Sequence, residues 1–422
     1  MNAIVFAKIL LAFALTGLLF FLLQLFKYYI RELKQHNDAR DNDCEMFLKE
    51  KRFYQEIKSK YPTTQSKKFK IYVDRNNVLK SSFDQIMKLR SSDLLPNNNI
   101  IISFKNEEGI DQGAITREWI TLILSIIFSP EIKLFYSPGD DVTKMIPGCT
   151  HVTNVDKLIY YRFLGRILGR MLVSKVNANV SFHEIVWKHM LEIPINMSDF
   201  EKLDLVLYKN LLSLREHSEN LQELKLTFEI EDVELIQNGK NIIVDESNLD
   251  LYIEEYLKHK YISKIKIQCD EIKLGINDVI PGGLINKFTY DHLKSLFCGL
   301  DNIDVADWIK NTRYDGFTIN DQIIIWFWEI IKNFTEDEKK LLLHFVTGSN
   351  RLPMRGFRDL SGSGVYLGRF TIRKIESDND KKFPIVKSCL NMLLLPEYSS
   401  KEVLKEKILY AIHNCAEGFA LR

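Results

Sequence analysis

The 422-residue chain has no excess of charge of either sign and has few cysteines. Its 57 lysine and arginine residues are balanced by 56 aspartate and glutamate residues, so the net charge gives no argument for nucleic-acid binding. The cysteines form no C-x-x-C pair and no cluster with histidine at metal-ligand spacing; they are Cys44, Cys149, Cys269, Cys298, Cys389 and Cys415. We therefore expect no metal site, no cofactor and no disulfide framework, and we interpret these residues as reduced thiols.

A long hydrophobic run occurs at the N-terminus. The segment Ile9–Phe26 contains no charged residue, and only Lys8 interrupts its extension back to Met1. At about 1.5 Å per residue such a helix spans about 27 Å, close to the hydrocarbon thickness of a bilayer. The sequence predicts a transmembrane signal anchor over residues 1–30, embedded through residues 4–26. An uncleaved signal peptide and a buried helix are the alternatives.

The charges around this segment predict its orientation. Lys27, Arg31 and Lys34 follow the segment, and Lys8 precedes it. Because positive residues favour the cytosolic side, we expect a single-pass membrane protein with the remainder of the chain in the cytosol. The sequence does not identify the membrane.

The rest of the chain divides into a linker and a globular part. Residues 31–67 are highly charged and poor in apolar residues, which indicates a solvated linker, and globular patterning begins near residue 68. With 46% hydrophobic residues the chain can bury a large core, and its length suggests two or three domains.

A buried helix is predicted in the middle of the chain. Apolar residues recur at helical spacing, namely Tyr160, Phe163, Leu164, Ile167, Leu168, Met171 and Leu172. A second stripe of Arg162, Arg166 and Arg170 indicates an ion-paired or solvated face of the same helix. Gly165 and Gly169 would allow another helix to approach closely.

A small β-containing insertion follows this helix. Leu224, Leu226, Phe228 and Ile230 alternate with polar residues, which predicts a half-buried strand. The Asn238–Gly239 dipeptide between apolar pairs predicts a hairpin turn.

A polar break at residues 311–316 divides two apolar blocks, and we predict a hinge between two lobes there. The second lobe ends in an informative segment, residues 383–422. A short apolar run, a turn containing Cys389, a second apolar run and an amphipathic helix follow one another. Ser399 and Glu402 resemble a capping box at the start of that helix. A cysteine where a strand becomes a loop suits a nucleophile that must be both held and reachable.

Several motifs in this order resemble the HECT family of ubiquitin-protein ligases over residues 68–422. They are Phe104 to Trp119 (FKNEEGIDQGAITREW), Phe163–Arg166, Leu226–Phe228, Phe297–Gly299, Asn311–Gly316, Ile323–Glu329, Phe345–Gly348 with Pro353 and Gly356, Ser388–Asn391, Leu395–Tyr398 and Phe419. The resemblance implies a bilobal α+β fold. It consists of a larger, mainly helical N-lobe (68–310) with a small β-containing subdomain (196–280), a hinge (311–316) and a smaller α+β catalytic C-lobe (317–422).

The resemblance also implies a reaction and its residues. Cys389 would accept ubiquitin as a thioester from a ubiquitin-conjugating enzyme and pass it to lysines of protein substrates. Supporting roles would fall to Lys387, Ser388, Asn391 and Phe419. The conjugating enzyme would bind a groove containing Leu211, Leu214, Leu221 and Leu224, and the hinge would contain Arg313, Tyr314, Asp315 and Gly316. The reaction requires no metal or organic cofactor.

Two departures from the family pattern leave alternatives open. Lys387 replaces the usual histidine, and Leu390 replaces the usual phenylalanine after the cysteine. A catalytically degenerate, membrane-tethered protein that binds ubiquitin or its conjugating enzyme is therefore one alternative. A papain-like cysteine hydrolase is another, with His413 as the histidine that follows Cys389. An acidic metal site at Glu107, Glu108 and Asp111 is a further possibility, against loop and capping roles.

Overall fold

The computed structural model describes residues 45–107, 113–139, 141–148, 155–216, 221, 223–360, 368–376 and 379–414. It contains two compact units, Met1–Lys60 and Tyr61–Arg422. In the first unit, residues 45–60 form a helix in which Phe53 is buried. The predicted transmembrane segment lies outside the described residues. Within the described part of the chain, no helix has both the length and the apolar character needed to cross a membrane.

The second unit begins with a mainly helical region. Its helices are α2 (Val78–Ile86), α3 (Ala114–Ile127), α4 (Val155–Ser174), α5 (Glu184–Met190), α6 (Met197–Leu203), α7 (Leu205–Glu216), α8 (Leu249–Tyr261), α9 (Lys266–Val279) and α10 (Tyr290–Cys298). Its strands are short and form three two-stranded sheets: β1 (Lys68–Val73) with β2 (Asn99–Phe104), β3 (Phe135–Tyr136) with β4 (Ile146–Pro147), and β5 (Glu229–Ile230) with β6 (Val233–Glu234).

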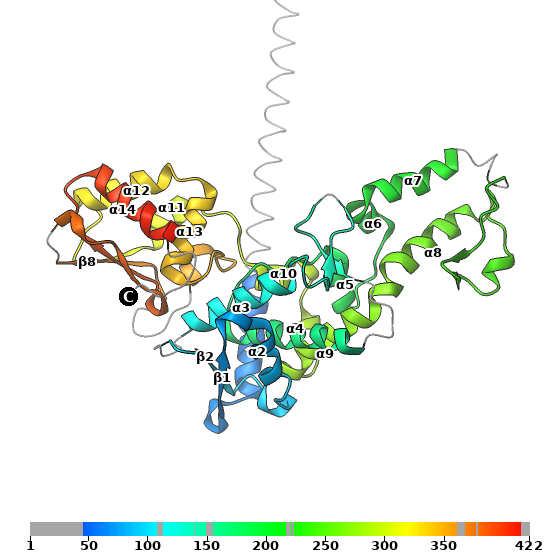
Figure 1. Ribbon diagram of the computed structural model, residues 1–422, viewed down its shortest axis with the longest axis horizontal. Coiled ribbons are helices and arrows are strands. Elements are labelled where there is room, and N and C mark those ends of the chain that lie inside the picture. The colour runs from blue at the N-terminus through cyan, green and yellow to red at the C-terminus, as the bar shows by residue number, and fades with distance from the viewer. Residues whose placement is uncertain are drawn as a thin grey trace, which may run out of the picture. The chain divides into compact units, whose positions relative to one another are not determined.

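The helices α4 and α9 pack together along their length at the centre of this region (Figure 1). The predicted apolar stripe of α4 is buried from Phe163 to Leu172. A Cβ atom placed on Gly165 would lie 2.1 Å from the carbonyl oxygen of Ile272, and one on Gly275 would lie 2.1 Å from that of Arg162. The predicted close approach at Gly165 is therefore confirmed, because the two backbones touch where neither helix has a side chain.

The arginine stripe of α4 is ion-paired for two of its three members. Arg162 and Arg166 both donate to Asp278 of α9, at 3.0 Å and 2.8 Å. Arg170 instead donates to the carbonyl oxygen of Asn98 at 3.2 Å, and burial lowers the pKa of its guanidinium to about 10. The stripe therefore fixes α4 to its neighbours and is not a solvated face.

The β-containing subdomain differs from its prediction. The hairpin of β5 and β6 turns at Glu231 and Asp232, whose φ angles of 50° and 63° are both positive, as in type I′ turns. The predicted hairpin turn at Asn238–Gly239 is wrong. A Cβ on Gly239 would lie 2.4 Å from the carbonyl oxygen of Phe228, so this glycine permits a close approach of two backbones. The predicted strand over residues 224–230 forms a ladder only at its last two residues.

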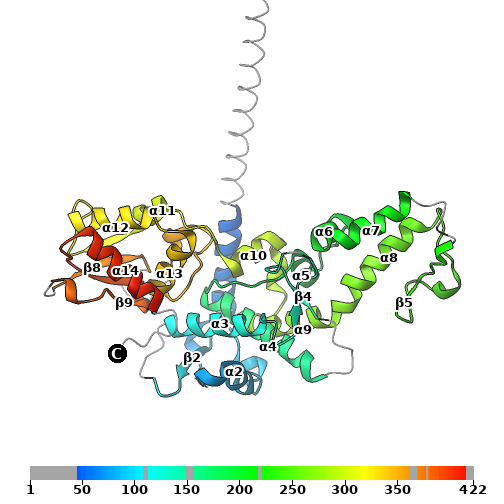
Figure 2. The same cartoon turned by 45° about the horizontal axis from the view of Figure 1, so that its top comes forward.

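The C-terminal part of the second unit has its own helices and sheet. Its helices are α11 (Val305–Asn311), α12 (Gln322–Lys332), α13 (Glu336–Thr347) and α14 (Lys401–Asn414), and its strands are β7 (Arg313–Asp315), β8 (Thr371–Ile375), β9 (Ile385–Lys387) and β10 (Met392–Pro396). The sheet order is β7-β8-β10-β9, with β9 antiparallel to β10 and the other neighbours parallel. Figures 1 and 2 show α14 beside α12 and α13, with which it packs.

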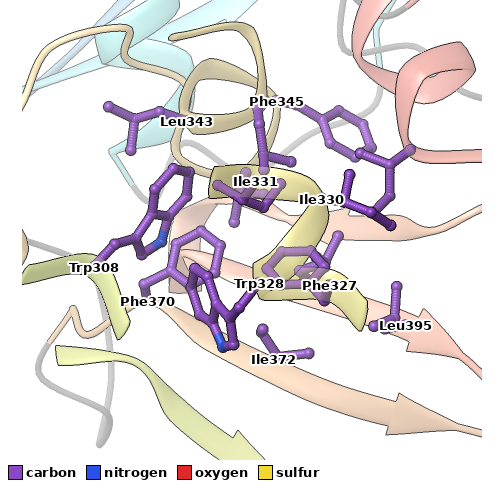
Figure 3. Packing of buried hydrophobic residues seen from close by; sticks show 14 of the residues in the cluster. Trp308, Phe327, Trp328, Ile330, Ile331, Leu343, Phe345, Phe370, Ile372 and Leu395 are labelled. Carbon is purple, nitrogen blue, oxygen red and sulfur yellow. The ribbon is translucent and has the colours of Figure 1, made fainter. Parts of the chain in front are cut away.

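Aromatic side chains fill the core between this sheet and its helices (Figure 3). Trp308 stacks on Phe357 with ring centroids 4.6 Å apart, and it meets the rings of Trp328 and Phe370 edge-on at 6.0 Å and 5.2 Å. The buried cluster runs from Ile303 to Ile412 in sequence. The mixed helix and strand content and this separate C-terminal core agree with the predicted bilobal α+β class.

The lobe boundary lies earlier in the chain than predicted. Arg313, Tyr314 and Asp315 form β7, which pairs with β8, and Trp308 belongs to the C-terminal core. A hinge at 311–316 is therefore wrong, because this segment is an integral edge of the sheet; Gly316 (φ 77°) makes the turn that follows. We call residues 61–298 the N-lobe, 299–302 the linker and 303–414 the C-lobe.

Candidate active site

Cys389 lies in the short turn between the antiparallel strands β9 and β10. Lys387, the last residue of β9, is paired with Met392, the first residue of β10, so residues 388–391 form the whole connection. Ser388–Leu390 is a single 3-10 turn, and the side chain of Cys389 is partly exposed. The sulfur is thus presented at the end of a two-stranded ladder.

Asn391 fixes the shape of this turn. Its φ of 51° places it in the left-handed region, which asparagine tolerates better than most residues. Its backbone N–H donates to the carbonyl oxygen of Ser388 at 3.2 Å, and its side-chain amide donates to that of Gly368 at 2.7 Å. The N–H of Thr371 donates to its carbonyl at 3.0 Å. The turn is therefore attached to the start of β8 as well as to its own strands.

The N-lobe also reaches the turn. The Nη2 atom of Arg117, in the first turn of α3, donates to the carbonyl oxygen of Ser388 at 3.0 Å. The sequence motif around Arg117 resembles a family signature, but the sequence alone did not indicate this contact. Nothing local to Arg117 marks a partner 271 residues later in the chain.

Two other described cysteines are in a different environment. Cys269 and Cys298 are buried, and burial raises the pKa of both thiols. A thiol with a raised pKa is a poor source of the thiolate that nucleophilic attack requires. Cys389 is the more accessible thiol of the three.

The predicted supporting residues are only partly within the described residues. Lys387 is exposed at the end of β9, and Ser388 and Asn391 flank Cys389 in the turn. Phe419 lies outside the described residues. The capping serine of α14 is Ser400, whose Oγ accepts from the N–H of Val403 at 3.3 Å, one residue later than the predicted Ser399.

The predicted groove for a conjugating enzyme needs correction. Leu211 and Leu221 are only 7% and 1% exposed, so they belong to the core of the subdomain. Leu214 is half-buried, whereas Leu224 is 56% exposed. Val233 and Ile243 are also largely exposed. The resemblance implied four leucines and did not include these two residues, whose exposure depends on how the subdomain folds.

The residues of two alternative hypotheses are described only in part, because Glu108 and Asp111 of the acidic group lie outside the described residues. His413 lies on the exposed side of the end of α14. Glu107 is paired with Arg75, whose Nη2 lies 3.0 Å from its Oε2, which is a structural role. Among the described residues, no group of three or more histidine, cysteine or acidic side chains is placed to hold a metal ion.

Comparison with known proteins agrees with this architecture. Residues 121–422 match the family model described as HECT-domain (ubiquitin-transferase). The chain is 35% identical over 382 residues to the E3 ubiquitin-protein ligase Nedd-4 of Drosophila melanogaster, covering 88% of this chain and 37% of that protein. It is 35% identical over 360 residues to the E3 ubiquitin-protein ligase HACE1 of Homo sapiens, covering 83% and 39%.

A third relative is the E3 ubiquitin-protein ligase ptr1 of Schizosaccharomyces pombe. It is 33% identical over 356 residues, which cover 83% of this chain and 11% of that protein. The chain thus spans well under half the length of each of these relatives. The family match covers more than half of the chain and includes the N-lobe from residue 121 onward, the C-lobe and the Cys389 turn. The chain belongs to the HECT-domain family.

Proposed function

We propose that this chain is a ubiquitin-protein ligase that carries ubiquitin as a thioester on Cys389. The observation that carries the proposal is the position of Cys389 in a HECT-family domain: it is a partly exposed thiol in a rigid turn at the end of a β-ladder. The relatives named above are all E3 ubiquitin-protein ligases. Ubiquitin, a conjugating enzyme and protein substrates are the partners that this activity requires.

The proposed reaction has two acyl-transfer steps. The Cys389 thiolate attacks the thioester that joins the C-terminus of ubiquitin to the conjugating enzyme; a new C–S bond forms, and the enzyme's thiolate leaves. The amine of a substrate lysine then attacks the thioester on Cys389, a C–N bond forms, and the Cys389 thiolate leaves, while the amine proton passes to solvent. Both steps depend on positioning and require no cofactor.

The conjugating enzyme is proposed to bind the exposed apolar side chains of the subdomain. Leu224, Val233 and Ile243 are each about half exposed or more, and exposed apolar groups of this kind often mark protein-binding surfaces. Leu214, which precedes them in the chain, is half-buried. Leu211 and Leu221 would support this surface from within the core.

Movement between the lobes is proposed to occur at the linker, residues 299–302. Gly299 has φ 61° and ψ −163°, a backbone conformation essentially restricted to glycine. Leu300 and Leu352 exchange backbone hydrogen bonds of 2.8 Å and 3.3 Å. Leu300 is thus bonded to the C-lobe and would move with it. A rotation of the C-lobe between the two proposed steps would therefore occur at Gly299, the residue before Leu300.

A membrane anchor at residues 4–26 is proposed from sequence alone, with residues 31–67 as a charged linker and the catalytic lobes in the cytosol. The support is the uncharged run Ile9–Phe26 and the positive residues that follow it. Deletion of residues 1–30 should move the protein from the membrane pellet to the supernatant after cell fractionation. Retention in the pellet, resistant to high salt, would exclude this segment as the sole anchor.

The ligase proposal is tested with the full-length chain in detergent micelles. Activating enzyme, a panel of conjugating enzymes, ubiquitin and ATP are added, and the products are separated on a non-reducing gel. We expect a ubiquitin adduct that disappears with thiol reductant, is absent in Cys389→Ala and persists in the matched variant Cys298→Ala. A folded protein that binds a conjugating enzyme but forms no adduct would instead be a tethered binding protein.

A further inference from the structure

We propose that Arg117 is a positioning residue that holds the Cys389 turn on the N-lobe while ubiquitin passes from Cys389 to an acceptor amine. This inference rests on the proposed ligase function. It is carried by the 3.0 Å hydrogen bond from Arg117 Nη2 to the carbonyl oxygen of Ser388. That carbonyl belongs to the peptide group that precedes the nucleophile, so the contact orients the turn without touching the reacting sulfur.

Arg117 is held firmly on the N-lobe by the residues that follow it. Glu118 accepts a hydrogen bond from Arg75 Nη1 at 2.7 Å, and the indole Nε1 of Trp119 donates to Ser82 Oγ at 2.9 Å. Glu118 and Trp119 are both buried. The first turn of α3 is therefore fixed on two sides, and Arg117 presents its guanidinium from a rigid base.

The receiving carbonyl is equally well fixed on the C-lobe. The Ser388 oxygen also accepts the N–H of Asn391 at 3.2 Å, and a carbonyl oxygen has two lone pairs, so both bonds can exist together. Asn391 is in turn bonded to Gly368 and Thr371. A bond from Arg117 to this oxygen therefore constrains the whole turn.

The contact is partly buried. Arg117 is only 9% exposed. A small, partly open pocket adjoins it, lined from the N-lobe by Asn177 and from the C-lobe by Ser349 and Asn391. A hydrogen bond from a charged donor in such a place is stronger than one in open solvent.

The contact favours the second acyl transfer over the first. α3 packs on α2 and β2, whereas the proposed surface for the conjugating enzyme lies on the segment with Val233 and Ile243. With Arg117 bonded to Ser388, Cys389 is placed beside α3 and not beside that surface. Loss of the contact should therefore slow discharge of ubiquitin and leave loading unchanged or faster. A purely structural role of Arg117 would slow both steps.

The test separates the two steps in the full-length chain in detergent micelles. Cys389 is loaded from a conjugating enzyme charged with labelled ubiquitin in a single turnover, and the thioester is then chased with free lysine. Arg117→Ala should slow discharge at least about tenfold, equivalent to about 1.4 kcal/mol in the barrier, while loading stays within about twofold. Arg117→Lys should restore part of the rate. The matched control is Arg90→Ala, an exposed arginine that pairs with its near neighbour Asp93.

A second measurement does not depend on ubiquitin. The alkylation rate of Cys389 by iodoacetamide, followed by peptide mass spectrometry, should rise at least about threefold in Arg117→Ala because the released turn exposes its thiol. Cys269 and Cys298 serve as internal standards. Equal slowing of loading and discharge, or unchanged alkylation together with unchanged discharge, would overturn the inference. If the unaltered protein forms no thioester, the ligase proposal fails, and the alkylation rates alone decide the role of Arg117.

Discussion

The contact between α4 and α9 in the N-lobe and the core of the C-lobe are packed in opposite ways. In the N-lobe, α4 and α9 approach so closely at Gly165 and Gly275 that their backbones are in contact. In the C-lobe, large aromatic rings around Trp308 fill the space between the sheet and its helices. The contact between α4 and α9 has no room for an added carbon atom, whereas the core of the C-lobe depends on the volume of its side chains. These two regions should therefore differ in which substitutions they tolerate.

The largest expected effect is that of removing the central ring of the C-lobe. Trp308→Ala should destabilise the C-lobe by about 3–5 kcal/mol, because it deletes a fully buried indole that contacts three other rings. The measurement is denaturant unfolding followed by circular dichroism. A loss below about 1 kcal/mol would mean that the aromatic cluster does not hold this lobe together.

A single added carbon should damage the N-lobe almost as much. Gly165→Ala should cost about 3 kcal/mol, because its Cβ would lie 2.1 Å from a backbone oxygen that no side-chain movement can relieve. Alanine is intrinsically favoured over glycine in a helix by about 1 kcal/mol, so this loss would appear against the propensity trend. An increase in the unfolding midpoint would contradict the close packing of α4 on α9.

Acid should weaken the C-lobe through His344 on α13. Burial lowers the pKa of this imidazole below its usual 6.5, so the unfolded chain binds the proton more readily than the folded one. The stability that His344 contributes is complete above pH 6.5 and is lost as pH falls from there through the folded pKa, by at most about 1.4 kcal/mol per pH unit. His344→Gln should flatten the dependence of the unfolding midpoint between pH 7.5 and 5.5. His413→Gln, at an exposed site, should not.

The smallest expected effect is that of Ile372→Val, which changes the side chain by one carbon atom, as Gly165→Ala does. Ile372→Val removes one carbon from β8 in the C-lobe core, and it should cost about 1 kcal/mol. Gly165→Ala changes the N-lobe by one carbon as well, but should cost about three times as much. Similar losses from the two substitutions, measured by the same unfolding assay, would remove the distinction between the lobes.

The sequence predicts best those features that depend on short-range pattern. The stripe of α4, the turn position of Cys389 and the buried face of α14 follow from periodicity that the folded chain preserves. The Asn238–Gly239 pair predicts a hairpin because it favours tight turns, whereas in the structure Gly239 is needed for contact with Phe228. Local preference alone cannot separate those two reasons for a glycine.

Contacts between residues far apart in the chain cannot be predicted from local sequence patterns either. The polar residues 311–316 interrupt an apolar pattern, as a hinge would, but a partly exposed edge strand such as β7 produces the same pattern. Arg117 gives no sign of Ser388 in its neighbouring residues. The burial of Leu211 and Leu221, against the exposure of Leu224, likewise depends on how the subdomain folds onto itself.

The carboxylate of Asp278 has a consequence for how the protein is made. It accepts bonds from Arg162 and Arg166 on α4 and from the hydroxyl of Ser91, which lies 187 residues earlier in the chain. Arg166 precedes Asp278 by 112 residues. At a translation rate of about 5–20 residues per second, the ribosome therefore needs about 6–22 s after making Arg166 to reach Asp278. Through that interval the apolar stripe of α4 has no α9 to cover it.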